Sequence, residues 1–344
     1  MKRTSCFLLA AVLLFSACQQ SFKKGEQGLE YKIISGSKGE PIKYGEFMQM
    51  EIAQIYSNGK KDSILSDTRT SSGAIIQPLD SINTPKEYFN ILKQLKNGDS
   101  LVIRILSDSI MQKNPMGLPP FMKKGHYLVT TVKMINVFKT REEAEAAFKE
   151  EQGKVEARMK EQSKEQEKKD IKTLEDYFAK NKIQVLKAPE GTFVEILTPG
   201  TGPNIDTSVV IKVKYTGKTM DGVIFDSNVD PSFPNHDPIL VNMTNDPSLG
   251  QPVIKGWTDG FKMLNKGAKA KFYITSPMAY GANSPTPKIP ANSILTFDVE
   301  VVDVLNKVQA KVEADAQMKK MNEIQKRFMD SMKQAHRDTT AKVK

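Results

Sequence analysis

The chain has 344 residues, enough for two or three domains, and its 50 basic and 40 acidic side chains give a formal net charge of +10. Residues 190–305 carry 9 basic and 12 acidic side chains, whereas the last 39 residues carry 10 and 5. The basic tail lacks the series of aromatic side chains that a stacking platform for nucleic acid needs, so we predict no nucleic-acid partner. The three histidines are scattered without metal-ligand spacing, so we predict neither a metal site nor a cofactor.

The chain begins with a predicted targeting segment. Lys2 and Arg3 precede an apolar run from Phe7 to Phe15, which is too short to span a bilayer and is typical of a signal-peptide core. Small residues then precede Cys18, a pattern that resembles a bacterial lipoprotein signal. Ordinary cleavage, with Cys18 a bystander, is the alternative.

Cysteine usage favours the lipoprotein interpretation. Cys6 would be removed with the signal, which leaves Cys18 as the only cysteine and no intramolecular disulfide. We therefore predict that residues 1–18 form a lipoprotein signal with lipidated Cys18. The protein would be exported and anchored by lipid to a membrane of the bacterial cell envelope.

The middle of the chain is divided by composition. Residues 19–27 are polar and are predicted to form a tether, and residues 28–138 are β-rich. Residues 139–188 are predicted to form a charged helical linker, because residues 139–187 hold 13 basic and 12 acidic side chains and no proline. Residues 306–344 are predicted to form a C-terminal helix and basic tail, and the helical segments could also pair two copies of the chain in a homodimer.

Residues 189–305 contain the most informative motifs. IKVKYTG alternates with period two and is followed by a turn at Asp221-Gly222 and by VIFD, which predicts a β-hairpin. VIKGWTDGFKML is short and amphipathic and contains Trp257, the only tryptophan. KAKFYITS and SILTFDVEVVDV are predicted strands separated by a proline-rich flap. The pattern predicts an antiparallel sheet wrapped around one short helix.

These blocks occur in the order YTG, DG, FDS, VIKGW, GFKMLNKGAKA, YG and IPANSILTFDVE, and together they resemble an FKBP-type peptidyl-prolyl cis-trans isomerase domain. The resemblance covers about a third of the chain. It implies an apolar pocket that binds proline-containing or unfolded polypeptides. The residues it assigns to catalysis are Tyr215, Phe225, Asp226, Ile254, Trp257, Tyr280 and Phe297, and those it adds for substrate binding are Val253 and Ile289.

The sequence departs from this family in two places. The run after Pro238 is longer than in small members, so the aromatic wall expected there is replaced, and Ile239 and Val241 are the candidates for it. The flap after Tyr280 contains prolines where the family often has glycines, which is expected to stiffen it.

An internal repeat is predicted, because three segments of the 28–138 region can be aligned with the isomerase-like region. In that alignment Leu95 matches Leu264 and Gly98 matches Gly267. The pocket is not retained, since the positions of Tyr215, Trp257 and Phe297 are occupied by Ile52, Tyr88 and Thr130. The predicted fold class is α+β, with an FKBP-type antiparallel sheet and short helix formed twice, joined by a long charged helix and followed by a C-terminal helix.

Two functions from different classes remain open at this level. The first is a peptidyl-prolyl cis-trans isomerase that assists folding of exported envelope proteins. The second is a non-catalytic chaperone that uses the same fold to hold extended chains. The retained pocket side chains favour the first, and the degenerate first domain with the long charged helix leaves the second open.

Overall fold

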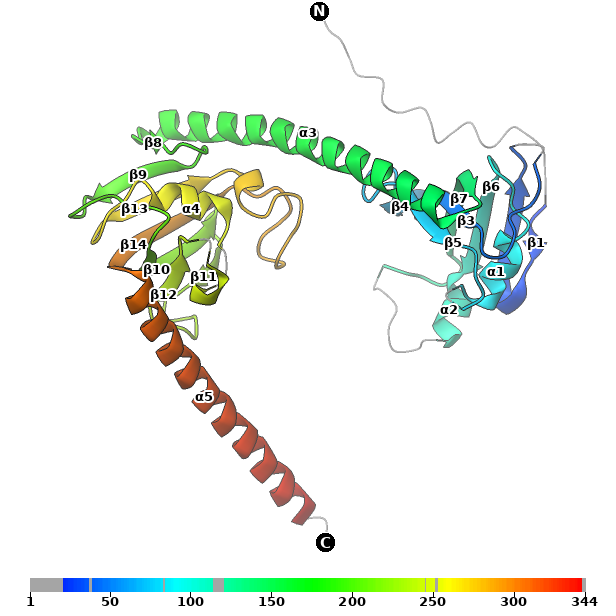
Figure 1. Cartoon of the computed structure of the whole chain (residues 1–344). Coiled ribbons are helices and arrows are strands. Elements are labelled where there is room, and N and C mark those ends of the chain that lie inside the picture. The colour runs from blue at the N-terminus through cyan, green and yellow to red at the C-terminus, as the bar shows by residue number, and fades with distance from the viewer. Residues whose placement is uncertain are drawn as a thin grey trace, which may run out of the picture. The chain divides into compact units, whose positions relative to one another are not determined.

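The computed structural model describes residues 21–36, 39–82, 84–113, 121–244, 246–250 and 253–341 (Figure 1). The chain divides into two compact units, Met1–Met159 (unit 1) and Lys160–Lys344 (unit 2), which are treated separately below. The predicted signal segment, including Cys18, lies outside the described residues. Helix α3 (Arg141–Asn181) contributes its first part to unit 1 and its last part to unit 2.

Unit 1 is built on a seven-stranded sheet in the order β1-β2-β6-β7-β3-β4, with β5 also paired to β3. All its strand pairs within the described residues are antiparallel. The strands are β1 (Lys23–Lys24), β2 (Leu29–Ile34), β3 (Phe47–Ser57), β4 (Asp62–Asp67), β5 (Ile75–Pro78), β6 (Ser100–Leu106) and β7 (Tyr127–Phe138). The helices are η1 (Glu26–Gly28), α1 (Lys86–Leu92) and α2 (Ser107–Lys113).

Alternation along the strands produces the core of unit 1. Met48 and Met50 on β3 are buried and lie on the same face, as a period of two requires. They pack with Leu101 of β6 and with Leu92 and Leu95 in and after α1. The short helix therefore closes one face of the sheet, as the sequence pattern predicts.

Unit 2 repeats this arrangement with the sheet order β11-β10-β14-β13-β9-β8 and β12 also paired to β10. Its strands are β8 (Leu186–Lys187), β9 (Phe193–Thr198), β10 (Val210–Thr219), β11 (Ile224–Ser227), β12 (Ile239–Asn242), β13 (Lys269–Ile274) and β14 (Leu295–Leu305). Its helices after α3 are η2 (Pro247–Leu249), α4 (Lys255–Phe261), η3 (Ser276–Met278) and α5 (Lys307–Ala341). Figure 1 shows α4 against one face of the sheet and α5 continuing beyond the sheet from the end of β14.

Strand register shows that the two units are structural repeats. The central pair β3/β7 has a bulge between Gln49 and Met50, and the central pair β10/β14 has one between Lys212 and Val213. Met50 and Val213 each follow the bulge, so Ile52 and Tyr215, two residues later, occupy the same position in the two units. The predicted α+β fold, formed twice, is thereby confirmed.

The last part of α3 covers the face of the unit 2 sheet opposite α4. Tyr273 points to this face because its neighbour Phe272 points into the core beneath α4. Leu174 and Phe178 of α3 pack on Tyr273 and on Phe193. The helix ends at Asn181, earlier than the predicted linker boundary at 188, and residues 186–187 form β8 instead.

Helix α5 is attached to unit 2 near its own first turns. Ala310 is buried with Val210, Leu249 and Leu305. Further along α5, Lys320 forms an ion pair with Asp237 at 2.7 Å. The helix extends to Ala341, so it includes most of the residues that were predicted to form the basic tail.

Candidate active site

The floor of the candidate site is the indole of Trp257 on α4, which is only 4% exposed. Its ring makes edge-to-face contacts with Tyr215 of β10, Phe297 of β14 and Phe261, at centroid distances of 5.1, 5.2 and 5.5 Å. Phe225 of β11 packs edge-to-face on Phe297 at 5.6 Å. Four elements thus bring their aromatic rings to one place, in the tilted geometry that aromatic quadrupoles favour.

A polar pair lies beside these rings. The Tyr215 hydroxyl donates a 2.6 Å hydrogen bond to Asp226 Oδ2, and Asp226 is otherwise exposed to solvent. Burial raises the pKa of the Tyr215 hydroxyl, and the hydrogen bond to Asp226 raises it further. The hydroxyl therefore stays protonated through the physiological range and keeps the carboxylate oriented at the edge of the site.

Tyr280 approaches the same carboxylate from the turn after η3. Its side chain is 37% exposed, and its pKa is raised first by burial and then by the negative charge of Asp226. Among the described residues no group hydrogen-bonds the Tyr280 hydroxyl. It is thus a neutral donor available to an incoming ligand.

The backbone at the start of α4 supplies a second donor. Ile254 is the residue before the helix, with extended backbone angles, and its carbonyl accepts from the Trp257 and Thr258 amides. No acceptor for the Ile254 N–H is found in the described part of the chain. Val253 is half-buried beside it.

The remaining predicted residues differ in their surroundings. Ile289 is 3% exposed and lies in the flap, where its amide bonds to the Thr286 carbonyl at 3.0 Å. Ile239 is half-buried on β12, whereas Val241 is fully buried opposite Ile211. Of the two candidates for the missing wall, only Ile239 keeps surface that a ligand could touch, because Val241 belongs to the core.

Gly217 is a site residue that the sequence reasoning missed. A Cβ atom on Gly217 would lie 2.7 Å from ring atoms of Phe225 and 2.8 Å from Phe297, so only glycine allows both rings to sit over the strand. A glycine inside the strand pattern YTG was the available signal.

Asn228 was also missed, and it holds β10 and β11 in place from a buried position. Its Oδ1 accepts from the Tyr215 amide at 2.7 Å, and its Nδ2 donates to the carbonyls of Val213 and Asp237 at 2.9 and 3.1 Å. Satisfying both ends of the amide in this way fixes the backbone that carries Tyr215 and Asp226.

The corresponding place in unit 1 has different chemistry. Register and helix position put Ile52, Tyr88 and Thr130 where unit 2 has Tyr215, Trp257 and Phe297. Ser66 pairs with Gln54, two residues after Ile52, and Asp226 pairs with Gly217, two residues after Tyr215. Register therefore puts Ser66 where unit 2 has Asp226. Unit 1 therefore lacks the carboxylate and the Tyr215 and Phe297 rings of unit 2, and a tyrosine takes the place of the indole.

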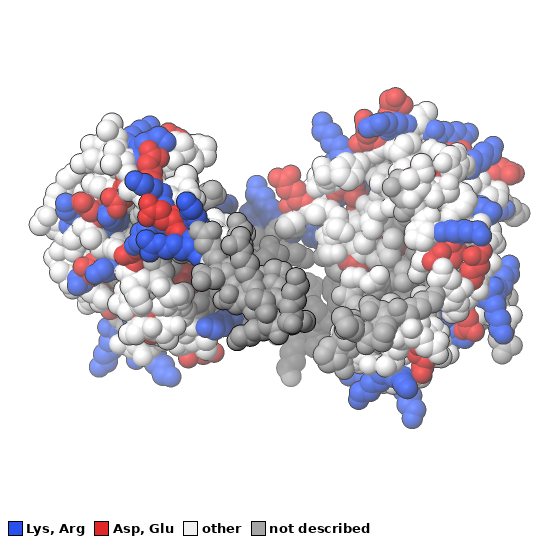
Figure 2. Space-filling model, turned by 90° about the horizontal axis from the view of Figure 1, so that it is seen from below, with Lys and Arg blue, Asp and Glu red and all other residues white. Residues whose placement is uncertain are grey.

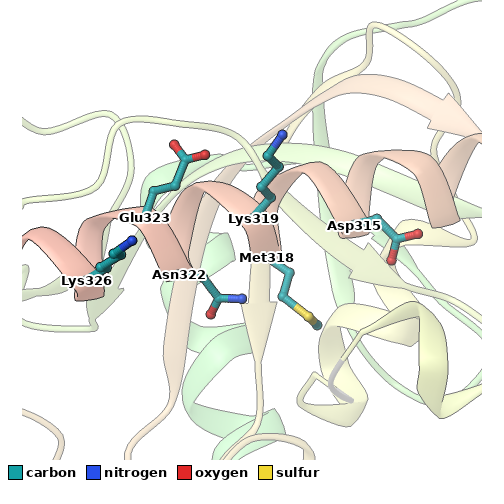
Figure 3. Close-up of a pocket in the computed structure, with 6 residues that line it drawn as sticks. All are labelled: Asp315, Met318, Lys319, Asn322, Glu323 and Lys326. Carbon is teal, nitrogen blue, oxygen red and sulfur yellow. The ribbon is translucent and has the colours of Figure 1, made fainter.

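The surface along α5 offers no comparable site. A hollow beside α5 is lined by residues of that one helix, so it has no opposite wall (Figure 3); these are Asp315, Met318, Lys319, Asn322, Glu323 and Lys326. On the surface seen in Figure 2, basic and acidic side chains are interspersed. In the described ranges no group of His, Cys, Asp and Glu could hold a metal ion. None of the helices described is both long and apolar enough to cross a membrane.

The comparisons with known proteins concern mainly unit 2. Residues 202–302 match the FKBP-type peptidyl-prolyl cis-trans isomerase family. A probable FKBP-type peptidyl-prolyl cis-trans isomerase from Haemophilus influenzae is 39% identical over 127 residues, which are 37% of this chain and 48% of that protein. The FKBP-type isomerase FkpA of Escherichia coli is 36% identical over 147 residues, or 42% of this chain and 50% of FkpA. The chain thus spans about half the length of these bacterial relatives.

A small relative is matched almost completely. FK506-binding protein 1A of Aspergillus fumigatus is 36% identical over 118 residues, which are 34% of this chain and 97% of that protein. A stretch of this chain therefore corresponds to nearly a whole small protein of this kind. The family match over residues 202–302 contains the Tyr215–Trp257–Phe297 cluster. The chain belongs to the FKBP-type peptidyl-prolyl cis-trans isomerase family.

Proposed function

We propose that unit 2 is a working peptidyl-prolyl cis-trans isomerase that acts on proline-containing or unfolded polypeptides. The observation that carries this proposal is the aromatic cluster around Trp257 with the Tyr215–Asp226 hydrogen bond and Tyr280 at its edge. The family relatives support the same activity by their names.

The reaction is a rotation about the amide C–N bond, and no covalent bond is broken. An X-Pro amide prefers the trans isomer only slightly, but its isomers interconvert over tens to hundreds of seconds. In the twisted amide the lost resonance makes the carbonyl less polar. An apolar site therefore favours the twisted form over the planar form, because the planar amide loses more hydration when it is buried.

Each residue group has a distinct role in this proposal. Trp257 is the surface against which the proline ring packs, with Phe225 and Phe297 beside it. The Ile254 N–H and the Tyr280 hydroxyl hold the carbonyls on either side of the bond. Asp226, oriented by the Tyr215 hydroxyl at the edge of the rings, lies beside the reacting carbonyl and interacts with it as its polarity changes. Val253, Ile289 and Ile239 complete the apolar lining.

The isomerase activity is tested by refolding of a protein whose slow step is X-Pro isomerisation. We expect Asp226→Leu and Tyr280→Phe each to lower kcat/KM roughly tenfold, the effect of losing one hydrogen bond to a charged or strongly polarised group. The unfolding transition of unit 2 should change little, because both side chains are partly exposed. Asp315→Leu on α5 is the matched control and should keep full activity. Absence of acceleration by the wild-type protein would refute the proposal.

A second role, binding of unfolded chains, is proposed for unit 1. Its pocket positions have lost the side chains of the isomerase site, yet edge strand β4 exposes apolar residues: Ile64 is 66% exposed, and Leu65 is also exposed. An extended polypeptide could pair with this edge and bring its prolines to unit 2 at a raised effective concentration.

The client-binding role is tested in the full chain by Ile64→Lys, which places a charge on the edge of β4. We expect unchanged turnover of a short proline peptide and severalfold slower catalysis of refolding of an unfolded protein. Lys60→Ala in the adjacent turn is the control. If Ile64→Lys acts as fast as wild type on the peptide and also on the unfolded protein, β4 does not bind clients.

Export and lipid anchoring are proposed from the sequence of residues 1–18. Cys18→Ser is expected to block processing or to release the protein from the membrane fraction, since the acyl chains attached to that cysteine supply the anchor. Fractionation of cells that express wild type and variant makes the measurement. Normal processing together with unchanged membrane association of Cys18→Ser would exclude lipidation at this residue.

Pairing of two copies through α5 is also proposed. Val308, Val312 and Met318 on this helix are 64–75% exposed, which leaves apolar area for a second helix. Sedimentation equilibrium of the protein without residues 1–18 distinguishes a dimer from a monomer.

A further inference from the structure

The last part of α3 carries one buried carboxylate in an otherwise solvated, charged run. Asp170 is 4% exposed, whereas its sequence neighbours Lys169 and Lys172 are exposed. Its Oδ2 accepts a 2.7 Å bond from the Ser276 amide and a 2.6 Å bond from the Ser276 hydroxyl. Its Oδ1 accepts from Gln166 Nε2 at 2.7 Å.

This carboxylate has no ion pair with a basic side chain within the described residues. A charge removed from water without a counter-charge is costly unless donors satisfy it. Here two of the three donors belong to Ser276, which is fully buried and 106 residues away along the chain. An apolar residue would pack in this place, as Leu174 does one turn later, but it could not hold Ser276.

Ser276 in turn controls the turn that carries Tyr280. It is the first residue of η3, and its carbonyl accepts from the amides of Ala279 and Gly281 at 3.0 and 2.8 Å. These two amides flank Tyr280 in the sequence. A chain of hydrogen bonds therefore runs from the Asp170 carboxylate through Ser276 to the backbone on both sides of Tyr280.

We infer that Asp170 is a positioning residue for the isomerase site, which acts through Ser276 to place the Tyr280 hydroxyl beside Asp226. The inference rests on the proposed function, because it gives Tyr280 its task on the substrate. It also makes the last part of α3 a component of the catalytic unit, although this helix lies on the face of the sheet opposite α4 and Trp257.

The kinetic test compares Asp170→Ala with Asp170→Asn in the full chain. We expect the alanine variant to lose roughly three- to tenfold in kcat on a proline peptide with KM nearly unchanged, since misplacement of a reacting group by about 1 Å can cost up to about a hundredfold. In Asp170→Asn the side-chain oxygen can still accept from Ser276, provided that Gln166 rotates its amide so that its oxygen accepts from the new NH₂ group. This variant should therefore keep most of the wild-type rate. Glu175→Ala, an exposed acid on the same helix, should change nothing.

Leu174→Ala separates positioning from stability. It removes buried side-chain volume from the same contact and should lower the melting temperature of unit 2, with kcat unchanged well below that temperature. If Asp170→Ala does not fold, Ser276→Ala removes one of the two bonds and serves in its place. A loss of kcat in Leu174→Ala as large as that in Asp170→Ala would overturn the inference.

A double-mutant cycle identifies the route of action. If Asp170 acts through Tyr280, Asp170→Ala should cause little further loss of kcat in a Tyr280→Phe background, whereas independent roles would multiply the two losses. Hydrogen exchange of the Ala279 and Gly281 amides gives a readout that needs no catalysis and should accelerate in Asp170→Ala. Unchanged exchange would refute the positioning link, whereas an inactive wild type with faster exchange in the variant would refute only the proposed function.

Discussion

Replacing Asp259 by alanine is expected to lower the free energy of unfolding of unit 2 by about 3 to 5 kcal/mol. Asp259 lies on α4 and is fully buried. Its Oδ1 accepts from the Glu190 amide and its Oδ2 from the Thr192 amide, both at 2.9 Å. Truncation leaves two donors without partners, one of them fully buried, and each orphaned donor costs about 1–3 kcal/mol in addition to the lost bonds to a charged acceptor.

The effect is large because Asp259 joins two parts of unit 2 that are far apart in the sequence. The Thr192 hydroxyl donates to the Gly256 carbonyl at 3.0 Å, so the segment before β9 is held to α4 by three bonds in all. Denaturant unfolding monitored by the fluorescence of Trp257 makes the measurement, since the single tryptophan reports on unit 2 alone. Asp259→Asn keeps one acceptor and should fall between wild type and alanine. A loss below about 1 kcal/mol in the alanine variant would contradict this account.

Trp257→Leu is expected to raise KM for a proline peptide roughly tenfold and to lower stability by about 2 to 4 kcal/mol. Leucine removes three edge-to-face ring contacts, each worth about 0.5–1.5 kcal/mol beyond the buried area. It also removes the flat ring against which the proline packs, and a tenfold change in affinity corresponds to about 1.4 kcal/mol.

Circular dichroism follows unfolding of the Trp257→Leu variant, because its fluorescence signal is lost. The matched control is Leu264→Ala, which creates a cavity in the same core cluster away from the candidate site. Both variants should be destabilised, but only Trp257→Leu should change KM at a temperature where both are folded. If KM rises equally in Leu264→Ala, the indole has no specific role in binding.

Local signals in the sequence were sufficient to predict the main elements of the repeated fold. Asp221-Gly222 predicts the hairpin, and Gly222 indeed has a positive φ of 88° in that turn. Leu264 and Leu95 mark the ends of the two short helices against their sheets, and both are buried. Such features depend on residues close in the chain, so pattern and period are enough to find them.

The supporting contacts of the site could not be predicted in the same way. Asp170 lies in EQEKKDIKTLED, where every other acid looks equally suited to solvent, and its partner is 106 residues away. Asn228 follows the strand VIFDS as an ordinary loop residue, yet it holds the Tyr215 amide. A polar side chain becomes part of a site through the donors that the fold brings to it, and one-dimensional periodicity contains no information about those donors.

The position of β14 in the unit 2 sheet has a consequence for biosynthesis. This last strand lies between β10 and β13, and its register pairs Thr219 with Leu295 and Val210 with Leu305, residues 76 and 95 apart. Pairings of such long range close slowly, because the loop entropy is lost before the contacts form. A nascent chain that ends before residue 295 has two half-sheets and lacks Phe297. Catalytic competence should therefore arise in a single late step, after nearly the whole unit has emerged, so that incomplete chains carry no partial activity.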